Sequence, residues 1–324
     1  MRYRVDVYTD EQTQQRMLEE DVRRGLLASP KSLPPKYFYD RAGSLLFQRI
    51  TELPEYYLTR TEAGLLAAIA PALAAELAHG DIVEIASGSS GKTRTVLDAL
   101  DGNRGQIRYV PLDVDRLTLE TSAARLIHDY PELSVHAVVG DFERHLAHVP
   151  PAAGPRLVLF LGSTIGNLDP PDRRRLLTDI RGLLEGPDDG FLLGVDLVKD
   201  ARVLNAAYDD PAGVTREFNR NILRVVNRGV GGNFDPEAFR HVAFYNATAA
   251  RIEMHLIAEA AQRVHLERLG LTIPFAAGED IWTESSYKFT RAGVEVMLDE
   301  AGLGLAQWHV DPAGYFALAL ARRR

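Results

Sequence analysis

The segment Asp81-Ile-Val-Glu-Ile-Ala-Ser-Gly-Ser-Ser-Gly-Lys-Thr-Arg94 decides the fold class of this chain. An apolar stretch of strand length, 81–86, runs into small residues and then into the start of a helix. This order is typical of the first strand, loop and helix of an open α/β sheet, where small residues let a ligand approach the backbone amides. A tight turn that binds no ligand has the same pattern and remains an alternative.

Further apolar runs of strand length alternate with segments of helix length. The predicted strands that follow are 107–112, 135–139, 157–161 and 191–196. Such alternation indicates a parallel sheet covered by helices. A helix is predicted over 61–79, and Asp169 followed by two prolines marks the start of another. A helix at 291–301 and a strand pair, 305–310 and 315–321, joined by a turn with Pro and Gly, follow near the end of the chain.

Two parts of the chain do not fit this alternation. Residues 199–282 mix helix-like and strand-like patterns, so we expect an insertion with its own fold. The first 57 residues contain Pro30, Pro34 and Pro35 and do not read as part of the sheet, so we assign them to the same second domain. At 324 residues, the chain is long enough for two domains.

Composition excludes several classes of protein. The chain has no cysteine, which removes disulfides, thiolate metal sites and a cysteine nucleophile and agrees with a cytoplasmic protein. Nine histidines show no convincing ligand spacing, so we expect no metal site. A net charge of −8 argues against a nucleic-acid partner. The apolar stretch 64–77 is too short to span a membrane and contains Pro71, and the N-terminus does not read as a signal peptide.

Two chemistries suit the loop after the first strand. Residues 86–93 read Ala-Ser-Gly-Ser-Ser-Gly-Lys-Thr, a phosphate-binding loop except that Ala86 replaces the first glycine. A methyltransferase-type loop for S-adenosylmethionine is the other interpretation. Asp113, at the end of the second strand and about 20 residues beyond the glycines, favours it because a carboxylate there can bind ribose hydroxyls. Asp141 and Phe142, at the end of the third strand, can contact adenine, although each acid could also be a helix cap.

The fourth strand ends in a loop of small and polar residues. Gly162, Ser163, Thr164 and Asn167 lie on it. Ligands of open parallel sheets bind at the carboxyl ends of the strands, so this loop should meet the transferable group. Asn167 offers both a hydrogen-bond donor and an acceptor, although a simple turn would also explain it.

Together with the Glu84 loop, several longer motifs make the chain similar to a known family over nearly its whole length. They are Lys31-Ser-Leu-Pro-Pro-Lys-Tyr-Phe-Tyr-Asp40, Leu53-Pro-Glu-Tyr-Tyr-Leu-Thr-Arg-Thr-Glu62, Phe160-Leu-Gly-Ser-Thr-Ile-Gly-Asn167, Asp196-Leu-Val-Lys-Asp200, Ala207-Tyr-Asp-Asp210, Phe218-Asn-Arg-Asn221 and Thr283-Glu-Ser-Ser-Tyr-Lys288. With these motifs the chain resembles the S-adenosylmethionine-dependent L-histidine Nα-methyltransferases of ergothioneine biosynthesis. It departs from the family pattern at Ala86, where a glycine is usual, and at Gly91, where an acidic residue is usual.

The resemblance implies an α/β fold with two domains. One is a Rossmann-like methyltransferase domain, 60–197 and 286–324, with a mostly parallel seven-stranded sheet. The other is an α+β substrate-binding domain, 1–59 and 198–285. The implied reaction transfers three methyl groups from S-adenosylmethionine to the α-amine of L-histidine, giving trimethylhistidine (hercynine) and S-adenosylhomocysteine. We expect a cytoplasmic monomer that acts on a small molecule, with neither nucleic acid nor membrane as a partner.

The resemblance also assigns roles to individual residues. The positions implied to bind the cofactor are Ala86, Gly88, Lys92, Asp113, Asp141, Phe142 and Tyr39, the last near the methyl group. The positions implied to bind the substrate are Tyr56, Asn167 and Tyr208 at the carboxylate, Gly162 and Thr164 at the amine, and Glu284, Ser286, Phe47 and Met254 at the imidazole. Asn167 and Tyr39 are the expected catalytic residues.

Histidine is the favoured substrate because Glu284 and Ser286 can read two ring nitrogens. An apolar amino acid would leave Glu284 buried without a partner, which permits discrimination of about 10⁴-fold. The alternatives are a relative that acts on another amino acid such as tryptophan, a phosphate-loop nucleotidase that uses ATP, and a binding or scaffold protein without activity.

Overall fold

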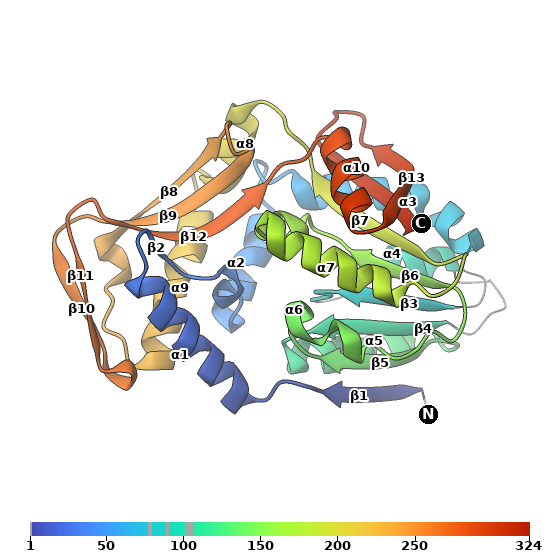
Figure 1. Ribbon diagram of the computed structural model, residues 1–324, viewed down its shortest axis with the longest axis horizontal. Coiled ribbons are helices and arrows are strands. Elements are labelled where there is room, and N and C mark those ends of the chain that lie inside the picture. Colours follow the sequence, from blue (N-terminus) through green and yellow to red (C-terminus); the bar gives the residue numbers. More distant parts are fainter. Residues whose placement is uncertain (1, 77–79, 89–90, 101–106) are drawn as a thin grey trace. The chain divides into compact units, whose positions relative to one another are not determined.

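The computed structural model describes residues 2–76, 80–88, 91–100 and 107–324. These residues form two compact units (Figure 1). The first unit contains the N-terminal residues through Asp10, Leu58–Leu197 and Phe289–Arg324. The second unit contains Glu11–Tyr57 and Val198–Lys288. The three C-terminal residues of the predicted helix 61–79 and Ser89 and Ser90 of the glycine loop lie outside the described residues.

The first unit is built on an eight-stranded sheet with the order β1-β5-β4-β3-β6-β7-β14-β13. All neighbouring strands up to β7 are parallel, whereas β14 is antiparallel to both β7 and β13. The strands are β1 (Tyr3–Val7), β3 (Asp81–Ile85), β4 (Arg108–Asp113), β5 (Ser134–Val139), β6 (Arg156–Phe160), β7 (Gly190–Asp196), β13 (Leu303–Val310) and β14 (Phe316–Arg323). The α/β class and the mostly parallel sheet are therefore confirmed.

The eighth strand corrects the prediction of seven. Strand β1 pairs in parallel with β5, from Tyr3 opposite Val135 to Val7 opposite Val139. The prediction that the first 57 residues lie outside the sheet is therefore wrong for this strand. The sequence concealed it because Arg4 and Asp6, which form an ion pair of 3.1 Å, alternate with the apolar residues. Charged side chains are common on short edge strands, where they prevent pairing with other chains.

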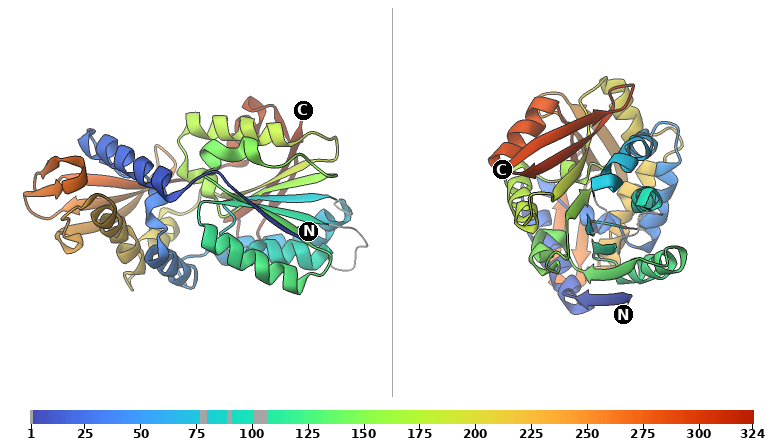
Figure 2. Two further views of the ribbon diagram at one scale, coloured as in Figure 1. Left: turned by 90° about the horizontal axis from the view of Figure 1, so that it is seen from below. Right: turned by 90° about the vertical axis from the view of Figure 1, so that its right-hand side faces the viewer.

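Helices cover both faces of this sheet (Figure 2). They are α3 (Leu58–Glu76), α4 (Gly91–Leu100), α5 (Arg116–Asp129), α6 (Phe142–His145), α7 (Pro170–Leu183) and α10 (Arg291–Glu300), with 3₁₀ turns η2 (Leu146–His148) and η3 (Thr164–Asn167). Helices α3, α4 and α5 lie on one face, and α7 and α10 lie on the other. Helix α7 begins at Pro170 as predicted, but the Asp169 side chain does not cap it. The apolar core includes Leu66, Ile82, Val96 and Leu126.

The second unit combines a four-stranded sheet, a hairpin and helices. The sheet has the order β2-β12-β9-β8, with β12 antiparallel to β9 and β9 antiparallel to β8. Its elements are α1 (Glu11–Leu27), β2 (Lys31–Ser32), η1 (Pro35–Phe38), α2 (Arg41–Thr51), α8 (Ala201–Tyr208), α9 (Val214–Val230), η4 (Pro236–Ala238), β8 (Phe239–Asn246), β9 (Arg251–Ala258), β10 (Gln262–Leu266), η5 (Glu267–Leu269), β11 (Leu271–Phe275) and β12 (Asp280–Tyr287). Helix α9 packs against α1, α2 and strands β8 and β9.

The insertion leaves and rejoins the first unit at one place. Leu197, just after β7, forms an isolated parallel bridge with Phe289, and the Phe289 amide donates to the Asp196 carbonyl over 2.8 Å. The two ends of the segment 198–288 are therefore held side by side by the large sheet. None of the helices in the described parts of the chain has the length and hydropathy of a membrane span.

Candidate active site

The loop after β3 is fixed by the end of β4. The Gly88 amide donates to Asp113 Oδ2 over 2.9 Å, and the Asp115 amide donates to Asp113 Oδ1 over 3.0 Å. Burial raises the pKa of the Asp113 carboxyl, and these amide hydrogen bonds oppose the rise. A carboxylate has about four acceptor positions, so Asp113 can still accept from a ligand hydroxyl. Ala86 has a φ of 54° and Gly88 a φ of 50°, in the left-handed region that favours glycine.

The side chains of α4 argue against the phosphate-loop interpretation. In such a loop the lysine and the threonine hydroxyl face the phosphates and magnesium. Here Lys92 forms an ion pair with Glu62, and the fully buried Thr93 donates to Glu84. Tyr109 also donates to Glu84, and burial raises the pKa of that carboxyl against these hydrogen bonds. Both residues of the pattern are therefore engaged with protein carboxylates.

Glu62 is a fully buried residue that the sequence analysis did not single out. Its Oε1 accepts from the Gly162 amide over 2.7 Å, while Oε2 pairs with Lys92. A Cβ atom at Gly194 would lie 2.2 Å from Glu62 Oε1, so glycine is required there for this approach. Glu62 thus ties the loop after β6 to α4. The sequence offers one indication of its importance, because Glu62 is the last residue of the family motif 53–62.

The loop after β6 has a strained start and a half-buried end. Gly162 has a φ of 77° and Ser163 a φ of 56°. Ser163 Oγ accepts from the Asp196 amide over 2.9 Å, and Thr164 Oγ1 donates to the Leu161 carbonyl over 2.9 Å. Asn167 ends the turn η3 and is half-buried. A non-glycine residue at positive φ needs support from its surroundings, and Ser163 has it in this hydrogen bond.

Asp141 and Phe142 follow β5. Asp141 Oδ1 accepts from the Glu143 amide over 2.9 Å, so the residue does cap the short helix α6, as the alternative interpretation expected. The Phe142 ring packs against Phe160 with centroids 5.6 Å apart. Capping uses one oxygen of Asp141 and leaves a second acceptor atom on the carboxyl group.

These four groups lie along one edge of the sheet. The glycine loop, Asp113, Asp141 and the loop that contains Asn167 follow β3, β4, β5 and β6, which are neighbours in the sheet. Ligands of open α/β sheets bind at this edge. Among the described residues, no atom lies within 4 Å of the Cβ position of Gly88, so this part of the loop has room for a ligand. A glycine loop with carboxylates beside it fits a cofactor that contains adenosine.

In the second unit, Glu284 and Ser286 lie on one face of β12. Side chains alternate along a strand, so residues 284, 286 and 288 share a face. The register with β9 shifts between Trp282 and Glu284, and Met254 is the partner of Glu284 across the pair. Such an irregularity re-aims the side chains that follow it. Glu284, Ser286 and Met254 are all buried.

The ionisation of Glu284 is perturbed. Burial raises the pKa of this carboxyl to about 7, and the positive charge of Lys288 opposes the rise. A carboxyl with a pKa near neutrality can donate or accept a proton from an imidazole, whose ordinary pKa is about 6.5. Lys288, which the sequence analysis did not assign, also contacts two predicted site residues. Its Nζ donates to Tyr208 Oη over 3.0 Å and to Ser286 Oγ over 2.9 Å.

The predicted aromatic residues form one cluster. Ring centroids lie 5.5 Å apart for Tyr39 and Phe47, 6.1 Å for Phe47 and Tyr56, and 6.3 Å for Tyr56 and Tyr208. Phe218, which the sequence analysis did not predict as a site residue, packs 5.5 Å from Tyr39 and 5.9 Å from Phe47. Burial of the hydroxyl group and the Glu284 carboxyl raise the pKa of Tyr39, although 43% of the residue as a whole is exposed, so Tyr39 is a neutral phenol at physiological pH.

Buried polar residues hold this cluster in place. Asn219 accepts from Thr283 Oγ1 over 2.7 Å and bonds His241 Nδ1 over 2.8 Å. His241 Nε2 lies 3.0 Å from the Tyr208 carbonyl oxygen, and burial lowers the pKa of the imidazole. Because a neutral imidazole has one donor and one acceptor nitrogen, His241 can accept from Asn219 and donate to Tyr208. The network joins α9 to the strand of Glu284 and the end of α8.

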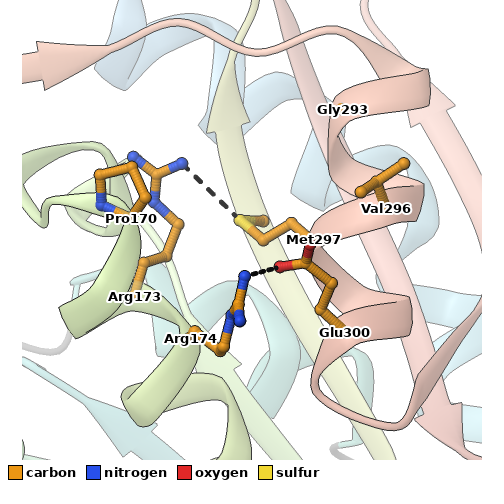
Figure 3. Close-up of a pocket in the computed structure, with 7 residues that line it drawn as sticks. All are labelled: Pro170, Arg173, Arg174, Gly293, Val296, Met297 and Glu300. Atoms are coloured by element: carbon orange, nitrogen blue, oxygen red, sulfur yellow. Dashed lines mark hydrogen bonds and ion pairs between the residues drawn. The ribbon is translucent and has the colours of Figure 1, made fainter.

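Two further observations concern a separate pocket and possible metal ligands. A pocket of the first unit lies between α7 and α10, where Arg174 pairs with Glu300 over 2.7 Å and Arg173 lies 3.9 Å from the sulfur of Met297 (Figure 3). It contains none of the predicted site residues. Among the residues that the structure describes, no group of three or more His, Cys, Asp or Glu side chains is placed to hold a metal ion.

The predicted site residues thus fall into two sets. The first unit carries Ala86, Gly88, Lys92, Asp113, Asp141, Phe142, Gly162, Thr164 and Asn167, and the second carries Tyr39, Phe47, Tyr56, Tyr208, Met254, Glu284 and Ser286. The sheet order, the antiparallel strand β14 and the carboxylates at successive strand ends define a Rossmann-like, S-adenosylmethionine-dependent methyltransferase.

The comparisons with known proteins place the chain more narrowly. It belongs to the family of S-adenosylmethionine-dependent, histidine-specific methyltransferases, whose model matches residues 18–323. It is 50% identical over 306 residues to the histidine N-alpha-methyltransferase of Mycolicibacterium smegmatis and 49% identical to that of Mycobacterium tuberculosis. Each match covers 94% of this chain and 95% of the relative. Ergothioneine biosynthesis protein 1 of Neurospora crassa is 32% identical over 272 residues, which cover 78% of this chain and 31% of that protein.

Proposed function

We propose that this protein transfers three methyl groups from S-adenosylmethionine to the α-amine of L-histidine, giving hercynine, the first step of ergothioneine biosynthesis. The observation that carries the proposal is the shared face of Glu284, Ser286 and Met254 in the second unit. Membership of the histidine-specific family supports the same substrate. The names of the mycobacterial and fungal relatives support the reaction and the pathway.

Glu284 and Ser286 suit an imidazole ring in spacing and in chemistry. Residues two apart on a strand are separated by roughly 7 Å. That span accommodates a five-membered ring with a hydrogen bond on either side. Glu284 pairs with one ring nitrogen and Ser286 with the other, while Met254 supplies an apolar contact. An indole has a single N–H donor and no ring acceptor, so tryptophan would leave one of the two polar groups unpaired.

The other predicted residues bind the rest of the substrate and the cofactor. Tyr56, Tyr208 and Asn167 hold the substrate carboxylate, and Gly162 and Thr164 lie beside the amine. The residues of the first unit that follow β3, β4 and β5 hold S-adenosylmethionine, with Asp113 at the ribose and Asp141 and Phe142 at the adenine. The aromatic faces of Tyr39 and Phe47 suit the trimethylammonium group of the product.

S-adenosylmethionine supplies a methyl group on a sulfonium, and the protein must present an amine with a free lone pair. An α-ammonium cannot react, so the substrate has to lose a proton. Asn167 orients the nitrogen, while Tyr39, a neutral phenol, contributes a hydrogen bond rather than a strong base. Holding the reactants in line can contribute about 7 to 11 kcal/mol to the rate. The single-turnover rate should therefore rise with pH until the amine is largely neutral.

We further propose a cytoplasmic monomer with neither nucleic-acid nor membrane partners. The net charge of −8 supports the absence of a nucleic-acid partner, and the cysteine-free composition suits a reducing compartment. The phosphate-loop nucleotidase is not supported, because Lys92 and Thr93 are engaged with Glu62 and Glu84.

Mass spectrometry of the twenty amino acids, incubated together with the purified protein and S-adenosylmethionine, tests the proposal. Histidine alone should gain three methyl groups, with S-adenosylhomocysteine formed in a threefold amount. Methylation of tryptophan in its place would contradict the roles of Glu284 and Ser286. If a folded protein modifies no amino acid, the proposed reaction is wrong.

A further inference from the structure

Lys288 is a buried cation at the end of the strand that carries Glu284 and Ser286. It is only 4% exposed and continues the alternation of β12, so it shares their face. Its backbone amide donates to the Ala250 carbonyl over 2.7 Å, which holds the residue in line with the sheet. A lysine is rarely buried to this extent without polar partners, and two of its partners here, Tyr208 and Ser286, are predicted substrate-binding residues.

Three polar atoms form a closed triangle. Lys288 Nζ lies 3.0 Å from Tyr208 Oη and 2.9 Å from Ser286 Oγ, and the two hydroxyl oxygens lie 2.9 Å apart. Nζ also lies 4.7 Å from the centroid of the Tyr208 ring. All three side chains are buried and belong to the second unit.

The ammonium group fixes the direction of these hydrogen bonds. A lysine ammonium has three donors and no acceptor, so both hydroxyl oxygens accept from Lys288. The contact between Tyr208 and Ser286 uses the hydrogen of one of the two hydroxyls. A carboxylate only accepts hydrogen bonds. Tyr208 can therefore bind a carboxylate only if Ser286 is the donor within the triangle.

We propose that Lys288 is a positioning residue for the substrate, acting through Tyr208 and Ser286. It orients Ser286 to donate to Tyr208, which directs the Tyr208 hydroxyl hydrogen to the substrate carboxylate and leaves Ser286 to accept from a ring N–H. Its positive charge also attracts that carboxylate. This inference rests on the proposed function, because it takes histidine as the ligand of Tyr208, Glu284 and Ser286.

The charges of the second unit then complement those of the substrate. Histidine carries a carboxylate at one end and a ring that can hold a positive charge at the other. Lys288 supplies a cation for the first and Glu284 an anion for the second. The same cation favours the ionised form of Glu284 and so opposes the effect of burial on the pKa of that carboxyl. Buried charges without such partners are costly.

The test compares Lys288→Met, Tyr208→Phe and the double variant, all as full chains. Lys288→Met keeps the length of the side chain and removes the charge. It should raise the KM for histidine on the order of 10- to 100-fold, since charged hydrogen bonds are lost, while the Kd for S-adenosylmethionine changes less than about twofold. Because Lys288 acts through Tyr208, adding Lys288→Met to Tyr208→Phe should cost much less than it costs the wild type.

Lys199 provides a matched control. Its Nζ donates to the Tyr57 hydroxyl over 2.7 Å and lies 4.6 Å from that ring centroid, in the same unit, and neither residue is a predicted site residue. Lys199→Met should leave the KM for histidine unchanged. Lys288→Arg retains a cationic donor, so it should recover part of the affinity that Lys288→Met loses.

Three results would overturn the inference. The first is a double variant in which the two effects multiply in full, and the second is an equal loss of histidine and cofactor affinity in Lys288→Met. If Lys288→Met does not fold, the uncharged variant Lys288→Gln replaces it. A wild-type KM for histidine in that variant, together with wild-type discrimination against histamine, which lacks the carboxylate, would be the third. A wild-type protein that folds but does not methylate histidine would instead refute the proposed function, and this inference with it.

Discussion

Histidine affinity should pass through a maximum near neutral pH. The free carboxyl of Glu284 has a pKa of about 7, and the free imidazole of histidine has an ordinary pKa of about 6.5. In the complex the two groups share one proton, either as carboxylate and imidazolium or as carboxylic acid and imidazole. Below the maximum both free groups are protonated and one proton must leave. Above it both are deprotonated and one proton must be taken up.

The size of the effect follows from these two pKa values. The fraction of free molecules in the required state is greatest at about pH 6.75, and it is roughly tenfold smaller at about pH 5 and pH 8.5. The binding constant should change by the same factor. Glu284→Gln removes the carboxyl titration and retains an amide that can bind neutral imidazole. Its affinity should therefore rise with pH through about 6.5 and then become constant.

Isothermal titration calorimetry with S-adenosylhomocysteine present measures this binding without turnover. In buffers of different ionisation enthalpy, proton uptake should be close to zero at the affinity maximum, positive above it and negative below it. An affinity independent of pH in the wild type, or an unchanged bell-shaped profile in Glu284→Gln, would refute the role assigned to Glu284.

Three other changes test separate parts of the structure. Asp113→Ala should weaken S-adenosylmethionine binding at least about tenfold, since it removes a carboxylate acceptor, and leave the histidine KM nearly constant; calorimetry that showed equal losses would contradict the division of the site. Ala86→Gly should raise the free energy of unfolding by about 0.5 to 1 kcal/mol, measured by denaturant titration, because Ala86 has a φ of 54°. Between its unfolded pKa of 4.5 and its folded pKa of about 7, Glu284 keeps a proton in the folded state that the unfolded chain has lost. As the pH rises through this window, the wild type should lose up to about 3 kcal/mol of stability relative to Glu284→Gln, and parallel stability curves would contradict this.

The sequence predicted the elements whose patterns are strong. Strands β3 to β7 are buried on both faces and read as continuous apolar runs, so their places were predictable to within one residue. The edge strand β1 was missed because its apolar residues alternate with Arg4 and Asp6. A charged edge strand has the same local pattern as an irregular segment, and only its pairing with β5 distinguishes the two.

The site residues that escaped prediction act through other residues. Glu62 and Lys288 both end motifs that support the family resemblance, but their partners are 100 and 80 positions away in the sequence, at Gly162 and Tyr208. Periodicity shows that Lys288 shares a face with Glu284, but it does not show that α8 brings Tyr208 to the same place. The phosphate-loop interpretation of residues 86–93 was misleading for a related reason. The partners of Lys92 and Thr93 come from α3 and β3, which the local pattern does not show.

The paired ends of the insertion bear on how such enzymes diversify. Leu197 and Phe289 are bridged, so the chain enters and leaves residues 198–288 at paired positions. Closing a loop whose ends already touch costs little chain entropy, and this cost grows slowly with loop length. The segment can therefore lengthen, shorten or be exchanged without changing the register of β7 and β14. A lineage could acquire a new amino-acid substrate by remodelling this segment while the strands that carry the cofactor-binding loops kept their pairing.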